Sequence, residues 1–232
     1  MRELEVRRLG AVSYGDALQL QRDLVEERRA GRLPDLLLLL QHPHVLTLGV
    51  RGDGGRSHVL ATPERLRALG VELFETGRGG DVTYHGPGQI VGYPILDLRP
   101  DRCDVHRYVR DLEEVMIRVA GEFGIRAGRV KGLTGTWVGA EKIGAIGVRI
   151  SRWITSHGFA FNVDTDLDYF RLIVPCGIVG RGVTSLARLT GRPIALPAIE
   201  EIFVRQFCDV FDRQLPSRGG QQGSGTDIVT RA

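Results

Sequence analysis

The chain has 232 residues, 42% of them hydrophobic, which is enough to bury one sizeable core. The formal net charge is +3, but the basic residues are scattered and form no tract of the kind that binds nucleic acid. No apolar stretch is long enough to span a bilayer, and the first residues lack the apolar run of a signal peptide. The three cysteines form neither a CxxC pair nor an even set. We therefore expect a cytoplasmic protein in a reducing compartment.

The first half of the chain predicts two helices and several strands. Ser13 is a good helix N-cap, and Gly31 followed by Pro34 ends the helix that it starts. Thr62 and Pro63 open a second, shorter helix. Short apolar runs mark the strands. In chain order we expect a helix at 14–30, strands at 35–40 and 45–50, a helix at 63–70, a strand at 71–76, a glycine-rich loop at 77–89 and a strand at 90–98.

An amphipathic helix and a run of strands dominate the second half. Asp104 caps the helix, whose apolar stripe comprises Val105, Tyr108, Leu112, Val115, Met116, Val119 and Phe123. Strands joined by tight turns are expected at 136–138, 142–150 and 157–163, and a short helix at 167–172. A final helix starts at Pro197, with Ile199, Ile202, Phe203, Phe207 and Val210 facing inward.

This mixture of elements predicts the fold class. Helices and strands follow one another without strict alternation, which is typical of an α/β (α+β) fold with a mixed or largely antiparallel sheet and flanking helices. We expect residues 1–215 to form a single domain. After Leu215 the sequence is dominated by Gly, Ser and Gln, so residues 216–232 are expected to be a disordered C-terminal tail.

Lysine is almost absent from the chain, and only Lys131 and Lys142 occur. Arginine supplies charge, but it does not release its proton in a protein, whereas lysine can. Lys142 lies among small and apolar residues that could desolvate its amine. The pattern indicates a lysine kept for proton transfer, although two lysines could also simply be left over in an arginine-rich composition.

Two glycine-rich regions favour close approach of a ligand to the backbone. The loop 77–89 contains five glycines and Arg78, but it matches neither the phosphate-binding P-loop nor the dinucleotide fingerprint, and it could be only an elaborate turn. His85 in this loop could act as a base, orient a carbonyl or hydrogen-bond within the turn. The strand segments 144–147 and 158–160 are also small enough for an acyl chain or a flat ring to approach, unless they pack against another strand.

Cys176 follows a proline and precedes a glycine, at a bend where a sulfur could face a pocket. A nucleophilic thiolate needs a proton acceptor or a nearby cation, and a lysine can serve as either. Cys176 and Lys142 are therefore candidates for a catalytic pair. The segment His42-Pro43-His44 is a weak candidate for a metal site, because no cysteine or carboxylate nearby completes a ligand set. We expect no metal.

Four segments together resemble the lipoyl(octanoyl) transferase family, octanoyl-[acyl-carrier-protein]:protein N-octanoyltransferases. They are Arg78-Gly79-Gly80 with Thr83-Tyr84-His85-Gly86-Pro87-Gly88-Gln89, Lys142-Ile143-Gly144-Ala145-Ile146-Gly147, His157-Gly158-Phe159-Ala160-Phe161-Asn162-Val163 and Pro175-Cys176-Gly177. Their order and approximate spacing match over most of residues 5–215. The composition and length are similar to actinobacterial members, the mycobacterial ones especially. One departure is Phe161, where many members carry leucine, and both residues are apolar.

The resemblance implies the fold of the biotin and lipoate protein ligase catalytic domain. It also implies transfer of an octanoyl group from acyl carrier protein to a lysine of lipoyl domains, on 2-oxoacid dehydrogenase subunits and the glycine-cleavage H protein. Cys176 aligns with the family's catalytic cysteine, which carries the acyl group as a thioester, and Lys142 with the lysine that activates it. The acyl-substrate contacts align with Arg78, Gly79, Gly80, Asp81, Val82, Thr83, Tyr84, His85, Ala145, Ile146, Gly147, Gly158, Phe159 and Ala160. We expect a monomer without a cofactor, and neither nucleic acid nor a membrane as partner.

Three other functions stay open at this point. An ATP-dependent lipoate or biotin ligase shares the fold, but it would need nucleotide and no cysteine. A cysteine amidotransferase would move octanoyl groups between lipoyl domains, with H protein as the donor. A binding module would hold a small acid or an acyl chain in the glycine-rich loop and leave Cys176 chemically inert.

Overall fold

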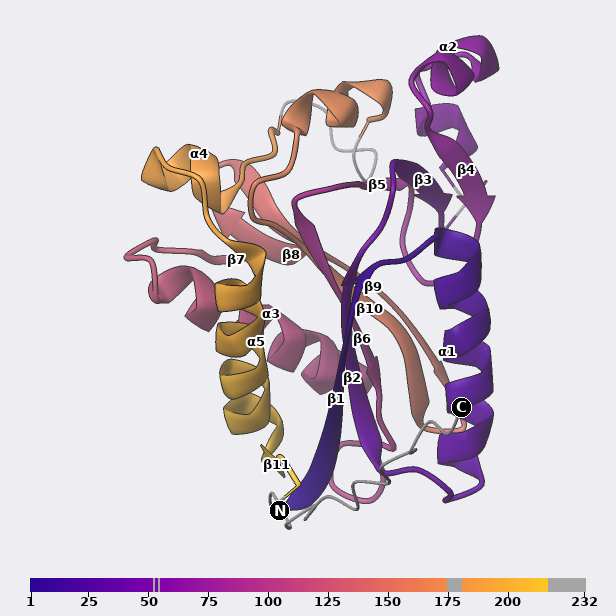
Figure 1. Cartoon of the computed structure of the whole chain (residues 1–232), viewed down its shortest axis with the longest axis vertical. Coiled ribbons are helices and arrows are strands. Elements are labelled where there is room, and N and C mark those ends of the chain that lie inside the picture. The colour runs from indigo at the N-terminus through magenta and orange to yellow at the C-terminus, as the bar shows by residue number, and fades with distance from the viewer. Residues whose placement is uncertain (52, 54, 175–180, 217–232) are drawn as a thin grey trace, which may run out of the picture.

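The computed structural model describes residues 1–51, 53, 55–174 and 181–216, which form two β-sheets with helices packed around them. The larger sheet has the strand order β11-β1-β2-β6-β10-β9-β8-β7, and the smaller has the order β4-β3-β5. In Figure 1, α3 and α5 lie to one side of the large sheet, and α1 lies to the other side, below the small sheet. The predicted α/β architecture, a mixed sheet with flanking helices, is therefore confirmed.

The large sheet combines parallel and antiparallel pairs. Strand β1 (Arg2–Ala11) runs parallel to β2 (Asp35–Gln41) and to β11 (Arg213–Gln214), and the remaining neighbours are antiparallel. The other strands are β6 (Gln89–Ile95), β7 (Gly128–Val130), β8 (Leu133–Val138), β9 (Glu141–Ser151) and β10 (Ile154–Asn162). The apolar run 36–40 of β2 is buried on both faces, as expected for a central strand that is covered on both sides.

A two-residue turn joins the hairpin of β9 and β10. Ser151 pairs with Ile154, so the loop consists of Arg152 and Trp153, and both have positive φ values, 51° and 66°. Positive φ at both positions matches the twist of the flanking strands. The hairpin carries Lys142 and both small-residue segments of the predicted site.

The small sheet places the glycine-rich segment against the large sheet. Strand β3 (Val45–Leu48) pairs in parallel with β4 (Glu72–Glu75) and antiparallel with β5 (Thr83–His85). A separate apolar cluster beneath it includes side chains from the covering helices α2 (Pro63–Ala68) and η2 (Leu167–Leu172). The short helix η1 (Arg56–His58) lies in the connection between β3 and α2.

The long helices begin where their capping residues predict. Ser13 accepts a hydrogen bond from the backbone N–H of Asp16 at the start of α1 (Tyr14–Arg29), and Asp104 accepts one from Arg107 at the start of α3 (Val105–Gly121). Helix α5 (Leu196–Phe211) has a proline in its first turn, and α4 (Leu186–Thr190) is short.

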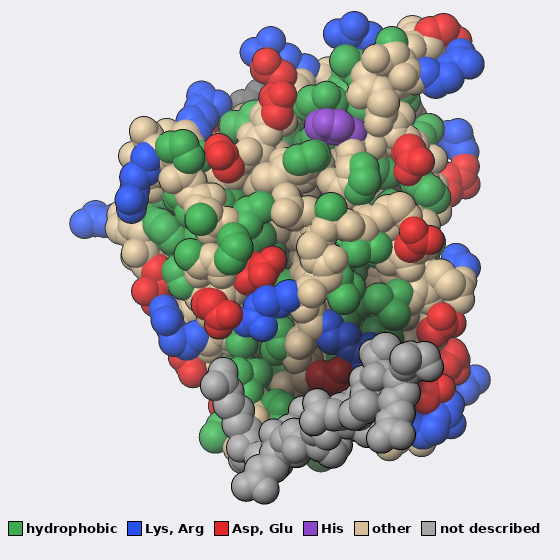
Figure 2. Space-filling model, viewed as in Figure 1, with side chains coloured by type: hydrophobic (Ala, Val, Ile, Leu, Met, Phe, Trp, Pro, Cys, Tyr) green, Lys and Arg blue, Asp and Glu red, His purple; other side chains and the backbone are tan. Residues whose placement is uncertain are grey.

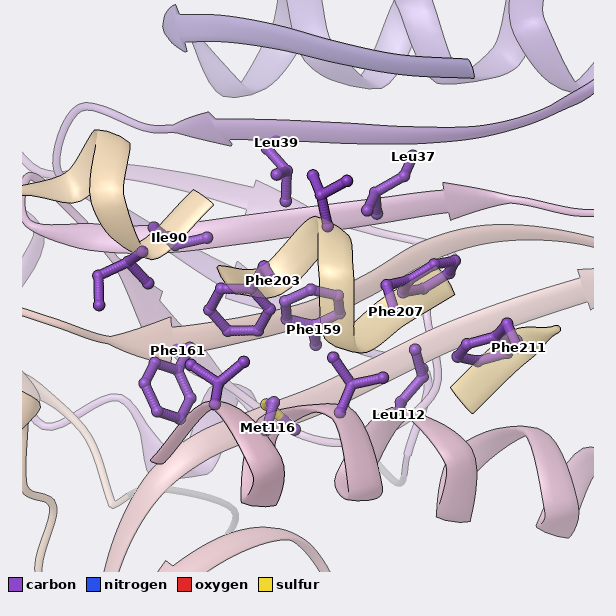
Figure 3. Packing of buried hydrophobic residues seen from close by; sticks show 14 of the residues in the cluster. Leu37, Leu39, Ile90, Leu112, Met116, Phe159, Phe161, Phe203, Phe207 and Phe211 are labelled. Carbon is purple, nitrogen blue, oxygen red and sulfur yellow. The ribbon is translucent and has the colours of Figure 1, made fainter. Parts of the chain in front are cut away.

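Aromatic side chains fill the core between the large sheet and helices α3 and α5. Figure 3 shows Phe203, Phe207 and Phe211 of α5 facing the residues of β10 and α3. The rings of Phe159 and Phe203 are stacked with their centroids 5.2 Å apart, and both side chains are almost fully buried. A second, smaller cluster packs α1 against the opposite face of the same sheet.

Charged side chains of both signs are intermixed on the face of the molecule shown in Figure 2, as the small net charge predicts. Across the described residues, no helix is both long enough and apolar enough to cross a membrane.

Several sequence predictions need correction. Val105 was placed on the apolar stripe of α3 but is 46% exposed, because it starts the helix ahead of the turns that pack on the sheet. The loop 77–89 contains strand β5, and the strand predicted at 45–50 ends at Leu48. Strands β1, β7 and β11 and helix α4 were not predicted. The predicted tail falls, from residue 217 on, outside the described residues.

Candidate active site

A cavity of about 480 Å³ lies between the hairpin of β9 and β10, strand β6 and the glycine-rich segment 78–85. The first residue of α1, Tyr14, also lines it. Nearly all the residues predicted from the family motifs contribute to its wall: Arg78, Gly79, Gly80, Asp81, Val82, Thr83, His85, Lys142, Ala145, Ile146, Gly147, Gly158, Phe159 and Ala160. The folded chain therefore brings three sequence-distant motifs to one hollow.

Tyr84 is the one described residue of the predicted set that does not line this cavity. Successive side chains of a strand point to opposite faces, so Thr83 and His85 face the cavity and Tyr84 faces the cluster under the small sheet. Its hydroxyl donates to or accepts from Nδ1 of His44 at 2.7 Å. Tyr84 therefore stabilises the small sheet on the side that faces away from the cavity.

Cys176 lies outside the described residues, but both flanks of its segment are anchored. Upstream, the N–H of Val174 donates to the carbonyl of His58 at 2.7 Å. Downstream, the N–H of Lys142 donates to the carbonyl of Gly182 at 2.9 Å, and the N–H of Thr184 donates to the carbonyl of Lys142 at 3.0 Å. The chain therefore returns from residues 175–180 directly onto the backbone of the candidate lysine.

The two lysines of the chain occupy contrasting positions. Lys131 is exposed in a turn, whereas Lys142 is buried to 8% exposure and lines the cavity. The Nζ atom of Lys142 lies 4.8 Å from the centroid of the Trp137 ring. The expectation that one lysine is kept in a desolvated place is therefore met by Lys142 alone.

Arg78 is buried and braces the glycine-rich segment. Its Nη2 donates to the carbonyl and to the hydroxyl of Thr47 at 2.6 and 2.9 Å, and its Nη1 donates to the carbonyl of Gly79 at 3.1 Å. A side chain on Gly147 would collide with this arginine, since a Cβ there would lie 2.8 Å from Cδ of Arg78. A Cβ on Gly158 would meet the carbonyl oxygen of Gly92 on the neighbouring strand. The small residues thus serve both strand packing and the shape of the cavity.

Uncharged histidines and tyrosines form another part of the wall. Burial, with smaller electrostatic contributions from His42 and from the positive charge of Arg78, lowers the pKa of His85 to about 3. Burial and the charge of Arg78 lower the pKa of His157 to about 4. His85 uses Nδ1 to donate to Oε1 of Gln89 at 2.7 Å, because the amide nitrogen of Gln89 donates elsewhere. At neutral pH His85 is therefore a neutral, oriented ring and a weak base.

Sequence reasoning missed several residues of this wall, among them Tyr14, Tyr93 and His157. Val91 and Tyr93 are two residues apart on β6 and therefore share a face, which the sequence does show. The sequence does not show that this face is the hollow one. His157 has a left-handed backbone, with φ of 54°, which no composition signal indicates.

The histidines of the His42-Pro43-His44 segment serve the structure. Nδ1 of His42 donates to the carbonyl of Val12 at 2.7 Å, so its Nε2 accepts from the hydroxyl of Tyr93, also at 2.7 Å. Both ring nitrogens are thus used. In the part of the chain that is described, no group of three or more His, Cys, Asp or Glu side chains could hold a metal ion.

Comparisons with known proteins agree with this geometry. Residues 13–208 match the lipoyl protein ligase A/B catalytic domain family. The chain is 52% identical over 215 residues to an octanoyltransferase of Solibacter usitatus, covering 93% of this chain and 96% of that protein. It is 53% identical over 209 residues to an octanoyltransferase of Rubrobacter xylanophilus, covering 89% and 93%. A lipoate protein ligase of T. acidophilum with bound lipoic acid has a similar fold, with a TM-score of 0.73 at 16% identity, covering 92% of this chain and 88% of that one.

Proposed function

The chain belongs to the lipoyl protein ligase A/B catalytic domain family, and on that premise we propose that it is an octanoyltransferase of lipoyl cofactor synthesis. It moves an octanoyl group from octanoyl-acyl carrier protein to a lysine ε-amine on lipoyl domains of 2-oxoacid dehydrogenase subunits and on the glycine-cleavage H protein. The high identity to two octanoyltransferases over most of their length supports this function. Residues 1–215 act as one catalytic domain, as a monomer, in the cytoplasm.

One observation carries the proposal: the only buried lysine of the chain lines a cavity whose other walls are largely apolar or uncharged. Pockets for small ligands are mostly apolar with a few placed polar groups, and this lining suits an aliphatic chain with a reactive group at one end. The anchored flanks of the 175–180 segment support the pairing of Cys176 with Lys142.

In the first step, the Cys176 thiol gives its proton to the Lys142 amine, and the thiolate attacks the carbonyl carbon of the donor thioester. A new carbon–sulfur bond forms to Cys176, and the bond to the phosphopantetheine sulfur breaks. The leaving thiolate takes the proton from Lys142. One thioester replaces another, so this step is close to balanced in free energy and needs no ATP.

In the second step, the lysine amine of the lipoyl domain attacks the acyl group on Cys176. The amide bond forms, the bond to the Cys176 sulfur breaks, and a proton of the amine passes through Lys142 to the departing sulfur. Because an amide is more stable than a thioester, this step drives the overall transfer. Backbone N–H groups of the glycine-rich segment would stabilise the oxyanion of each tetrahedral intermediate. Those of Gly79 and Val82 are not among them, because they already donate to Val148 and Asp81.

Intact-protein and peptide mass spectrometry after incubation with octanoyl-acyl carrier protein, without ATP, tests the proposal. We expect one octanoyl group on Cys176 and its transfer to an added lipoyl domain. Cys176→Ala should abolish both. The described cysteines give matched controls, since Cys103 is exposed and Cys208 is half-buried, and Cys103→Ala or Cys208→Ala should leave the adduct in place.

The same experiment separates the competing functions. A requirement for ATP would indicate a ligase, and an acyl group taken only from octanoylated H protein would indicate an amidotransferase. Saturable octanoate binding with no adduct would indicate a binding module. Full transfer by the Cys176→Ala variant, or an adduct on Cys103, would contradict the proposed mechanism.

A further inference from the structure

One indole ring contacts two cations beside the proposed catalytic pair. Trp137 on β8 pairs directly with Lys142 on β9, and its side chain is buried to 3% exposure. Nζ of Lys142 lies 4.8 Å from the ring centroid, and Cζ of Arg181 lies 5.4 Å from the same centroid. Tryptophan is the aromatic side chain that attracts cations most strongly, and the attraction is larger where water is excluded. The arrangement is therefore more specific than ordinary core packing.

The backbone of β8 holds the indole in a defined place. The register between β8 and β9 shifts between Thr136 and Trp137, an irregularity that re-aims the side chain at that point. The N–H of Gly135 donates to Oε1 of Glu113, a fully buried residue of α3, at 2.9 Å. Glu113 is in turn paired with an arginine of α3 and with Arg129. Strand β8 is thus braced against α3 next to the indole.

Arg181 connects the indole to the segment that contains Cys176. It is the first described residue after 175–180, and the next residue, Gly182, accepts the backbone hydrogen bond of Lys142. Trp137 therefore contacts the side chain of Lys142, the proposed base, and also that of Arg181, which follows the 175–180 segment in the sequence. No other described residue is recorded with a cation–π contact to either side chain.

We propose that Trp137 is a positioning residue for acyl transfer. Its ring face holds the cationic forms of Lys142 and Arg181, and so fixes the position of the Lys142 amine at the cavity. This inference rests on the proposed function, because it assigns Lys142 the role of proton carrier. A residue that only filled space would be replaceable by any apolar side chain, whereas a cation platform requires an aromatic face.

A substitution series at Trp137 tests this difference. Trp137→Tyr, Trp137→Phe and Trp137→Leu should form the Cys176 adduct at rates that fall in that order, because the attraction for a cation falls in the same order. We expect Trp137→Leu to be roughly 10- to 30-fold slower than the native chain, corresponding to the loss of a desolvated cation–π contact. The rates should be measured across pH, since a displaced amine also alters the pH dependence of adduct formation. Leucine and phenylalanine variants of equal rate would overturn the proposal, as would an unchanged pH profile.

Fluorescence tests the contact itself without any acyl donor. The chain has two tryptophans, so Trp153→Phe leaves Trp137 as the sole emitter. In that background Lys142→Met and Arg181→Met should each change the emission. Arg188→Met should not, because Arg188 lies on α4 and its guanidinium pairs with Glu141. Emission that responds to neither Lys142→Met nor Arg181→Met would overturn the proposal.

The two experiments distinguish a failure of this inference from a failure of the proposed function. If the native chain forms no adduct on Cys176, the proposed function fails, and the fluorescence still reports the contact. If the adduct forms but its rate is indifferent to the ring at 137, the positioning role alone is wrong.

Discussion

The two faces of the large sheet are built from the same strands and serve opposite purposes. Against α3 and α5, Phe159 and Phe161 of β10 pack on Phe203 of α5, and Phe159 also contributes to the cavity wall. On the other face, towards the first turn of α1, Tyr93 of β6 and His157 of β10 border the 480 Å³ cavity. Because strand side chains alternate between faces, one set of strands can do both. The comparison teaches that the same strands can support a closely packed aromatic core and also border a cavity.

The largest effect on activity should be seen at Lys142, which lines the cavity. Lys142→Arg keeps a positive charge in the cavity but removes a group that can give up its proton, so transfer to a lipoyl domain should fall by about 10²–10⁴-fold. Lys131→Arg, the matched change at an exposed site, should have no effect on the rate. Steady-state transfer rates measure both, and equal activities of the two variants would remove Lys142 from the mechanism.

The packed face should respond in stability rather than in activity. Phe207 is fully buried and stacks on Phe211 with ring centroids 4.3 Å apart. Phe207→Ala should lower the free energy of unfolding by about 3–5 kcal/mol, measured by urea denaturation, while the rate per folded molecule stays near that of the native chain. Tyr93→Phe on the open face should cost only about 1 kcal/mol, since it loses one hydrogen bond to His42. A larger loss of unfolding free energy for Tyr93→Phe than for Phe207→Ala would contradict the contrast between the two faces.

Mild acid should lower the free energy of unfolding, because three buried histidines have lowered pKa values. Burial lowers the pKa of His42 and His157 to about 4 and that of His85 to about 3, whereas histidines of an unfolded chain titrate near 6.5. The unfolded chain therefore binds these protons between pH 6.5 and about pH 4, and the folded chain does not. Stability should be full above pH 6.5 and decrease below it, by up to about 1.4 kcal/mol per pH unit for each histidine.

Urea denaturation at pH 7, 6 and 5 measures this slope. His42→Asn should reduce the pH dependence of the free energy of unfolding by the contribution of one histidine. His106→Gln, at an exposed position of α3, should leave it unchanged. A free energy of unfolding that is flat from pH 7 to pH 5 would show that the cavity wall accepts these charges in the folded state.

Much of the fold could be predicted from local sequence, because several elements carry their own signals. The cap at Asp104 and the periodic apolar residues of α3 predicted that helix closely, and the apolar run 36–40 predicted a buried strand. Strand β1 escaped prediction because only Leu4 and Val6 alternate with polar residues before Arg7 and Arg8 interrupt the pattern. Its identity as a strand comes from its neighbours in the sheet.

The sequence predicted which residues belong to the candidate site better than it predicted how they are arranged. Nearly all the motif residues line the cavity, but the motifs did not predict other lining residues such as Val109 and Leu133. Tyr84 faces the opposite side because it lies in strand β5, which the glycine-rich sequence did not reveal. The contributions of Tyr93 and His157 depend on which face of the sheet is left hollow. That choice is made by the packing of α1 and the small sheet, which no local pattern specifies.

The hydrogen bonds at Val174 and Gly182 have a consequence for the length of the segment between them. Both ends are tied to other parts of the chain, to His58 on one side and to Lys142 on the other. A residue added or deleted between Val174 and Gly182 would change only the segment between these two hydrogen bonds. The strands and helices outside the segment would keep their registers. The number of residues between the two hydrogen bonds can therefore vary without a change in the registers of the sheet.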